Sequence, residues 1–248
     1  MPVRETEAII LRTYPLKEAD KIVSFFSRDA GRVRGVARNA RRSVRRFGAA
    51  LELLSHVRLR YFQQETRDLV RLDSCELLQS FFETQRNYEA SIGFCYIAEV
   101  CEQLLPEGEA NDPFFRLVLL VANQIRRTEQ IWQPLTYFDL WAVKLAGFLP
   151  RLDVCCRCGV KFEPGEQAWF RPEWEGLGCE ACRGEGSWRF SADSRAVART
   201  MLASSLEVVS PEGWSKSRAE DLRKFLGQQI ERHIERRLIT RPQLEALP

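Results

Sequence analysis

Hydrophobic and polar residues alternate with a period of two through much of the first 80 residues. Short alternating runs, separated by turn-forming residues, cover residues 7–12, 21–27, 31–37, 51–62 and 69–78. This is the period of a half-buried β-strand, in which successive side chains point to opposite faces. Short strands that are basic on one face favour a small β-barrel such as an OB-fold. A helix within this region would change the strand count by one.

The period of the hydrophobic residues changes after residue 79. Apolar side chains recur at helical spacing over residues 88–104. Asp112 as an N-cap with Pro113 behind it predicts a second helix that ends near residue 125, and Pro134 and Ser191 mark the starts of two more. A further apolar stripe predicts a long final helix and consists of Phe225, Leu226, Ile230, Ile234 and Leu238.

These patterns predict an α+β protein with two domains. Residues 1–80 form the expected OB-fold domain, and residues 81–248 form a helical bundle domain. Glycine and cysteine interrupt the helical pattern at about residues 150–190, where we expect a small irregular lobe.

Arginine is concentrated in residues 28–46, which contain eight arginines, one acidic residue and no lysine. The first half alternates as a strand does, and the second half, from Arg38 on, is typical of an exposed loop. The arginine guanidinium binds phosphate through two hydrogen bonds and stacks on bases. We therefore predict a DNA-binding surface, with a solvated basic face as the alternative. Its residues are Arg32, Arg34, Arg38, Arg41, Arg42, Arg45 and Arg46.

Four aromatic side chains in the same region are possible platforms for stacked bases, although core packing explains each of them equally well. They are Tyr14, Phe47, Tyr61 and Phe62.

The charge is unevenly distributed along the chain. Residues 1–80 carry 16 Lys and Arg against 10 Asp and Glu, a balance of +6, and residues 81–248 carry 21 against 24, a balance of −3. A basic N-terminal module beside a mildly acidic remainder indicates two regions with different partners. The N-terminus is too polar for a secretory signal, and no apolar run is long enough to span a bilayer, so we expect a cytoplasmic protein without a membrane partner.

Cysteines in two Cys-x-x-Cys pairs, twenty residues apart, predict a metal site. The pairs are Cys155 with Cys158 and Cys179 with Cys182. Each pair lies on a tight turn that directs both sulfurs to one ion, and four thiolates close a tetrahedral zinc site, which makes the zinc structural. Unliganded thiols are the alternative, and Cys156 could compete with the first pair. The sequence lacks a phosphate-binding GxxxxGK[ST] loop, a GxSxG motif and a carboxylate triad for magnesium, so we do not expect an enzyme.

Several stretches resemble the RecO family of recombination mediators and DNA-repair proteins. In the N-terminal region they are residues 6–11, 14–20, 25–31 and 36–42, and the approach to the first cysteine pair, residues 145–159, resembles the family's zinc knuckle. Asn39 stands where a glycine is common in the family, and Ser27 where a threonine is common. The resemblance implies an N-terminal OB-fold followed by a helical domain that bears a zinc finger.

The resemblance also implies a function and partners. It implies binding of single- and double-stranded DNA, annealing of complementary strands, and partnership with RecR and with the acidic C-terminal tail of the single-strand-binding protein SSB. Together with RecR such a protein helps to load RecA on SSB-coated DNA, and it would associate with the nucleoid. A zinc-containing RNA-binding or ribosome-associated factor is the alternative, because a basic barrel suits RNA equally. A nuclease, or a scaffold for an acidic protein, are further alternatives.

Overall fold

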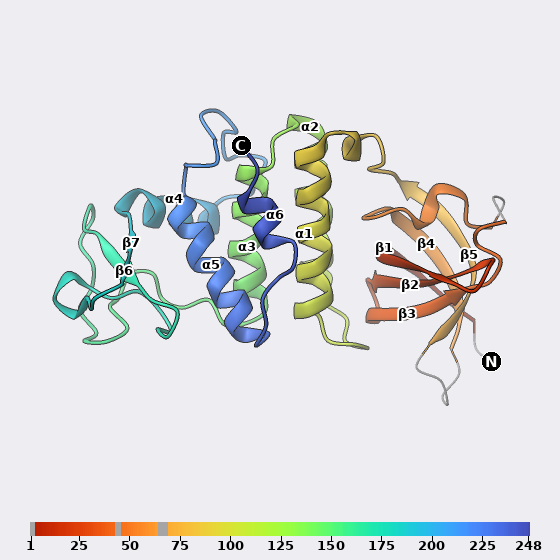
Figure 1. Ribbon diagram of the computed structural model, residues 1–248, viewed down its shortest axis with the longest axis horizontal. Helices are drawn as coiled ribbons and strands as arrows, with labels where there is room; N and C mark the ends of the chain where they lie inside the picture. Colours follow the sequence, from red (N-terminus) through yellow and green to blue (C-terminus); the bar gives the residue numbers. More distant parts are fainter. Residues whose placement is uncertain (1–2, 43–45, 64–68) are drawn as a thin grey trace. The chain divides into compact units, whose positions relative to one another are not determined.

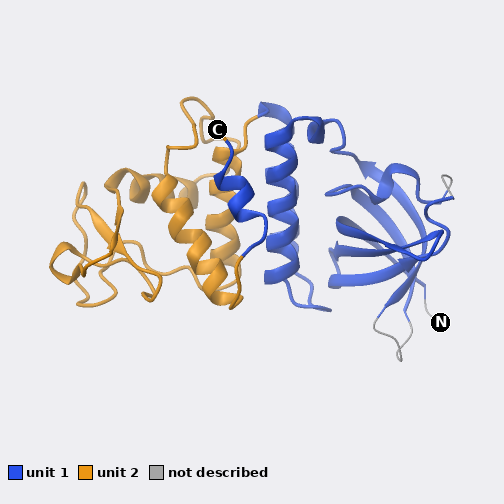
Figure 2. Cartoon of the chain, in the orientation of Figure 1, with its two compact units in different colours: residues 1–129, 238–247 blue, residues 130–237, 248 orange. Residues whose placement is uncertain are grey.

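The computed structural model describes residues 3–42, 46–63 and 69–248, and the chain divides into two units (Figure 2). Unit 1 comprises residues 1–129 and 238–247, and unit 2 comprises residues 130–237 and 248. An N-terminal sheet followed by helices gives the mixed α+β class that the sequence predicts. The predicted domain boundary between residues 80 and 81 lies within unit 1, so the division into 1–80 and 81–248 stays a prediction.

The N-terminal strands of unit 1 close into a barrel in the order β1-β2-β3-β5-β4 (Figure 1). Neighbouring strands are antiparallel except β3 and β5, which are parallel. A 3₁₀ turn, Gly48–Leu51, precedes β4, so Leu51 lies outside the strand that was expected to start there. The strands are β1 (Val3–Leu16), β2 (Asp20–Ser27), β3 (Gly31–Ala37), β4 (His56–Phe62) and β5 (Val70–Gln79).

Inward-facing apolar side chains from all of these strands fill the barrel. Phe25, Leu59 and Tyr61 are buried in this core, and the rings of Phe25 and Tyr61 meet edge to face with centroids 5.9 Å apart. Gly35 allows the parallel closure, because a Cβ at this position would lie 2.7 Å from a methyl group of Val70. The alternation in the sequence therefore reports the inside and the outside of the barrel.

Helices of unit 1 cover the outer face of β1 and β2. The ring of Phe26 on β2 packs edge to face against Phe114 and Phe115 of α2 (Asp112–Thr128). The predicted N-cap of α2 is wrong by one residue. Asn111 is the cap and accepts a hydrogen bond from the Phe114 N–H, while Asp112 is the first helical residue. The preceding helix, α1 (Tyr88–Leu104), has the predicted bounds and follows a 3₁₀ turn, η2 (Thr84–Arg86).

The end of the chain returns to unit 1. Glu99, a buried carboxylate on α1, accepts hydrogen bonds from the N–H groups of Ile239 and Thr240 and from the Thr240 hydroxyl. The short helix α6 (Arg241–Glu245) follows. The predicted long final helix is wrong, since α5 (Glu220–His233) ends five residues before Leu238, and Glu235 has a positive φ of 55° that breaks the helix.

Unit 2 contains α3 (Trp132–Leu145), α4 (Ala192–Ala203), α5 and a small lobe. Ser191 caps α4, as predicted, by accepting a hydrogen bond from the Ser194 N–H. The lobe holds two paired three-residue strands, β6 (Ala168–Phe170) and β7 (Trp188–Phe190), and the 3₁₀ turn η3 (Glu180–Cys182). None of the helices formed by the described residues is long and apolar enough to cross a membrane.

Candidate nucleic-acid interface and metal site

The loop after β3 presents three exposed arginines, Arg38, Arg41 and Arg42. The turn that carries them is docked on the β1–β2 turn. Asn39 takes a left-handed conformation with φ 57°, and its N–H donates to Asp20 Oδ1 at 2.8 Å. Asparagine tolerates this conformation better than most residues, so Asn39 can stand where the family that the sequence resembles commonly has a glycine. The Arg41 N–H donates to the Ala19 carbonyl at 3.0 Å, which fixes the loop on the barrel.

The side chains of this loop are exposed, although Arg41 Nη1 also donates a hydrogen bond to the Glu18 carbonyl at 3.3 Å. Arg42 is 72% exposed, and the nearest carboxylate, that of Glu18, is 3.9 Å away and 93% exposed. An ion pair so exposed contributes little and leaves the guanidinium available. Within the predicted DNA-binding set, Arg38, Arg41 and Arg42 thus form one available group, which we call the arginine loop.

The two arginines on β3 are held by their own molecule. The Glu107 carboxylate lies 3.2 Å from Arg32 Nη2 and 3.4 Å from Arg34 Nε. Arg32 also donates from Nε to the Leu105 carbonyl at 3.2 Å. The structure therefore places both on the outer face of β3, as predicted, but in contact with a carboxylate.

Arg46 is held by contacts within its own molecule. Its Nε donates to the Asp73 carbonyl at 2.9 Å, and its guanidinium lies over the Phe47 ring, 4.8 Å from the centroid. These contacts tie the segment before β4 to β5. Arg45, also in the predicted set, lies outside the described residues.

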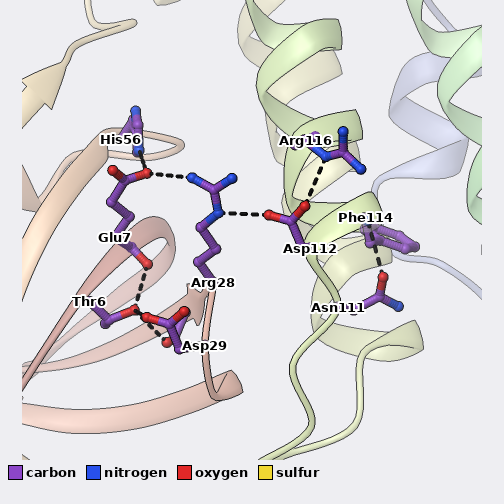
Figure 3. Close-up of polar contacts among 10 residues, drawn as sticks. Thr6, Glu7, Arg28, Asp29, His56, Asn111, Asp112, Phe114 and Arg116 are labelled. Atoms are coloured by element: carbon purple, nitrogen blue, oxygen red, sulfur yellow. Dashed lines mark hydrogen bonds and ion pairs between the residues drawn. The ribbon is translucent and has the colours of Figure 1, made fainter.

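A second polar network joins the turn after β2 to the start of α2 (Figure 3). Arg28 donates to Asp112 Oδ1 at 2.6 Å and to Glu7 Oε2 at 3.1 Å, and Glu7 also contacts His56 Nε2 at 3.3 Å. Asp112 accepts a further contact from Arg116 at 2.9 Å. Burial lowers the pKa of His56, although the neighbouring Glu7 opposes this shift. Arg28 is thus neutralised within the protein.

Two of the proposed aromatic platforms belong to the core. Phe47 and Tyr61 are each 2% exposed and cannot stack on a base. Tyr14 is 44% exposed. Phe62 is half-buried and is covered by the guanidinium of Arg71, 4.5 Å from the ring centroid.

Arg71 is an exposed basic residue of the barrel that lies outside the predicted DNA-binding set. It is exposed on β5, in register with Val36 of β3 on one side and Phe62 of β4 on the other. A cation over an aromatic ring on an open sheet face is a combination that suits nucleic acid. The alternation of residues 69–72 was the available signal.

The four predicted metal ligands converge in the lobe of unit 2. The sulfur atoms of Cys155, Cys158, Cys179 and Cys182 all lie within 4.8 Å of one another, and those of Cys158 and Cys179 are 3.7 Å apart. Four sulfurs at about 2.3 Å from a tetrahedral zinc ion would be roughly 3.8 Å apart. The thiols are therefore close enough to hold a metal ion of this kind.

Backbone N–H groups that point at the cluster favour the thiolate form of Cys155, the form that binds a cation. Burial opposes ionisation of Cys155, but backbone N–H groups, including those of Cys179 and Arg157, lower its pKa to about 6. The side chains of Cys158 and Cys179 raise the pKa of Cys182 to about 12, because the thiols share their protons. A bound dication would relieve this competition, since it favours the thiolate at every ligand.

The remaining cysteines lie outside the metal cluster. Cys156 is exposed, and its backbone N–H donates to the Leu177 carbonyl at 2.8 Å. Cys101 is fully buried, whereas Cys75 and Cys95 are only half-buried. Burial raises the pKa of Cys75 to about 12, so this thiol stays protonated.

Fold and site together define a mixed α+β protein that combines an N-terminal sheet, a helical region and a four-cysteine cluster of metal-site geometry. Family models named "Recombination protein O N terminal" and "Recombination protein O C terminal" match residues 1–81 and 85–242. The chain belongs to the RecO family.

Individual relatives agree with this assignment. A DNA repair protein RecO from Koribacter versatilis is 44% identical over 245 residues, 99% of both chains. One from a Nocardioides species is 33% identical over 83% of this chain and 84% of its own. One from Symbiobacterium thermophilum is 29% identical over 100% of this chain and 98% of its own.

Proposed function

We propose that this protein is a non-catalytic mediator of DNA repair and recombination that binds single- and double-stranded DNA and anneals complementary strands. The observation that carries the proposal is the arginine loop, which holds three exposed guanidinium groups on a barrel in a chain of the RecO family. We further assign the barrel to the OB-fold class, because it is small, closed and carries exposed arginines on its outer surface.

The mechanism follows from charge. Arginines that contact phosphates release condensed counterions, so affinity falls as salt rises. Contacts to the backbone carry little sequence information, which suits a protein that must act on any complementary pair. Neutralising two strands lowers their mutual repulsion, and annealing then needs no nucleotide hydrolysis. If about five phosphates of a single strand are engaged, the slope of log affinity against log salt is about −3.5.

The cysteine cluster would bind one structural zinc ion. Cys155, Cys158, Cys179 and Cys182 supply four thiolates, which leave no open position for a reacting water. The ion would hold residues 155–182 folded.

A pocket in unit 2 supports the proposed partnership with the acidic tail of SSB. It has a volume of about 500 Å³ and combines apolar walls, such as Leu149, Phe162 and Leu202, with Arg195 and Arg199. Arg195 Nε is buried without a hydrogen-bond partner among the described residues, while Nη2 of the same side chain donates to the carbonyl groups of Glu163 and Glu166. An acidic peptide with an apolar end would match both properties. RecR as a partner, RecA as an indirect one, and a cytoplasmic, nucleoid-associated location complete the proposal.

A triple variant tests the DNA-binding role. Replacing Arg38, Arg41 and Arg42 with glutamine should lower the affinity for single-stranded DNA by more than tenfold and make the salt slope shallower by about 2, since each lost phosphate contact removes about 0.7. Fluorescence anisotropy across a salt series measures both. The matched control replaces three exposed arginines of the helices and η2, Arg86, Arg116 and Arg127. Equal binding by the two variants would reject the arginine loop as the DNA site.

Competition between RNA and single-stranded DNA of the same sequence separates the alternative RNA-binding role. We expect DNA to bind at least as tightly as RNA. An RNA preference of tenfold or more would favour the alternative.

A further inference from the structure

The connection between α1 and α2 lies along β3. The Arg32 N–H donates to the Pro106 carbonyl at 3.4 Å, and the Gly108 N–H donates to the Arg32 carbonyl at 3.3 Å. Gly31 permits this approach, because a Cβ at this residue would lie 2.0 Å from the Glu109 carbonyl oxygen. The backbone of residues 106–109 is thereby fixed against the strand that carries two of the predicted DNA-binding arginines.

This placement puts one carboxylate between two guanidinium groups. Glu107 Oε1 is 3.2 Å from Arg32 Nη2 and 3.4 Å from Arg34 Nε. An oxygen anion shared by two arginines is also the arrangement in which these side chains would hold a phosphate of a nucleic-acid backbone.

We propose that Glu107 is an internal competitor for phosphate, which occupies Arg32 and Arg34 in the free protein and is displaced by DNA. The inference deepens the proposed function and rests on it. Glu107 would then set the extent of the interface, because the arginine loop binds first and the β3 arginines join only where a strand displaces the carboxylate. The protein thereby binds DNA more weakly than its arginine content suggests, which lets annealed strands dissociate.

The geometry makes displacement feasible. The side chains of Glu107 and Arg34 are 52% and 48% exposed, so their ion pair is weak in water and screened by salt. The Arg32 side chain is 23% exposed and keeps its hydrogen bond to the Leu105 carbonyl, so it is already positioned when the carboxylate leaves. The loop itself is held by its backbone hydrogen bonds, so the carboxylate can swing away while residues 106–108 stay in place. Arg28 differs, since it is held by two carboxylates at once, those of Glu7 and Asp112.

The test replaces Glu107 with glutamine, which keeps the side-chain length and removes the charge. The freed arginines should raise the affinity for single-stranded DNA by about tenfold at moderate salt. Two added phosphate contacts should steepen the salt slope by about 1.4. In a background of R32Q and R34Q, the same substitution should have no effect on affinity.

The matched control is Glu109→Gln. Glu109 lies on the same loop and is exposed, and among the described residues it makes no ion pair. An equal gain in E109Q and E107Q would reduce the effect to net charge and overturn the inference. A lower melting temperature of E107Q without a gain in DNA affinity would also overturn the inference. Glu107 would then only stabilise the position of residues 106–109 on β3. If E107Q does not fold, Glu107→Asp serves as the second variant and should give a smaller gain in the same direction.

The two proposals fail in different ways. If wild-type protein shows no salt-dependent DNA binding, the proposed function fails. If wild-type protein binds through the arginine loop and E107Q binds no more tightly, only the competitor role of Glu107 fails.

Discussion

The barrel of unit 1 and the cysteine lobe of unit 2 are stabilised in different ways. In the barrel, every strand pairs with two neighbours, and a continuous apolar core fills the interior. In the lobe, two strands of three residues each make up the sheet, and the backbone turns around four thiols. Buried apolar area and closed hydrogen bonding stabilise the first region, and we propose that ligand bonds to a metal stabilise the second.

The candidate DNA-binding loop and the candidate metal site lie in different units of the chain. The arginine loop is anchored to the barrel through Asp20 and Ala19, which belong to unit 1, as the loop does. Loss of the metal should therefore unfold the lobe and spare DNA binding, whereas damage to the barrel core should affect both stability and binding.

Removal of the metal should have the largest effect. Structural zinc contributes about 10 kcal/mol or more to the folding of small zinc sites. A strong chelator, or Cys182→Ser, should therefore unfold residues 155–182. Hydrogen exchange would show loss of protection in β6 and η3, with unchanged protection in β1–β5, and DNA affinity should change by less than threefold.

Cys156→Ser is the control for the metal prediction, because Cys156 is exposed and outside the cluster. This variant should retain one zinc per chain. A metal content of zero in freshly purified, reduced protein would contradict the zinc assignment.

The second-largest effect should come from removing an aromatic side chain from the barrel core. Phe25 is fully buried and contacts Tyr61, so Phe25→Ala should lower the free energy of unfolding by about 3–5 kcal/mol. Denaturant unfolding measures the loss. Phe82→Ala is the control, since this ring is 49% exposed and should cost less than about 1 kcal/mol. Equal losses would mean that the barrel core does not limit stability.

The two regions also differ in how far the sequence could predict them. The strands follow from alternation, and the metal ligands follow from two spaced Cys-x-x-Cys pairs. Both patterns lie within short stretches of the sequence, so they can be recognised without knowledge of the fold. The end of α5 was missed because the apolar stripe continues to Leu238, although Leu238 belongs to unit 1.

The predicted DNA-binding arginines make contacts that a short stretch of sequence could not predict. The pattern placed Arg32 and Arg34 on an outer face, but it could not show that Glu107 contacts both, since 73 residues separate Glu107 from Arg34. The Arg46 contact with the Asp73 carbonyl likewise joins segments 27 residues apart. The composition gives the number of arginines in the chain. Whether a guanidinium group is available to a phosphate depends on partners that only the folded chain brings together.

Loss of the Glu99 anchor should have a smaller effect than Phe25→Ala. Glu99→Ala leaves the Ile239 and Thr240 donors without their acceptor, which should cost about 2–3 kcal/mol. Limited proteolysis should then cut near residue 238 first. Glu83→Gln removes a carboxylate that is 73% exposed, and this control should be nearly neutral. If E99A is cut no faster than wild type, the carboxylate is not what holds the end of the chain.

The smallest predicted effect is a pH dependence at His56, which lies on β4 of the barrel against Phe115 of α2. Burial lowers the pKa of His56 in the folded protein, so the unfolded chain binds more protons at mildly acidic pH. The contribution of His56 to stability is therefore complete above its ordinary pKa of about 6.5 and is lost as the pH falls through the lower folded pKa. Unfolding curves at a series of pH values should show this decline for wild type and a flatter profile for His56→Gln. Because the contact ties the barrel to α2, the decline should appear as loss of the whole unit-1 transition, with the lobe of unit 2 unchanged. A profile for H56Q as steep as that of wild type would show that His56 is not the source of the acid sensitivity.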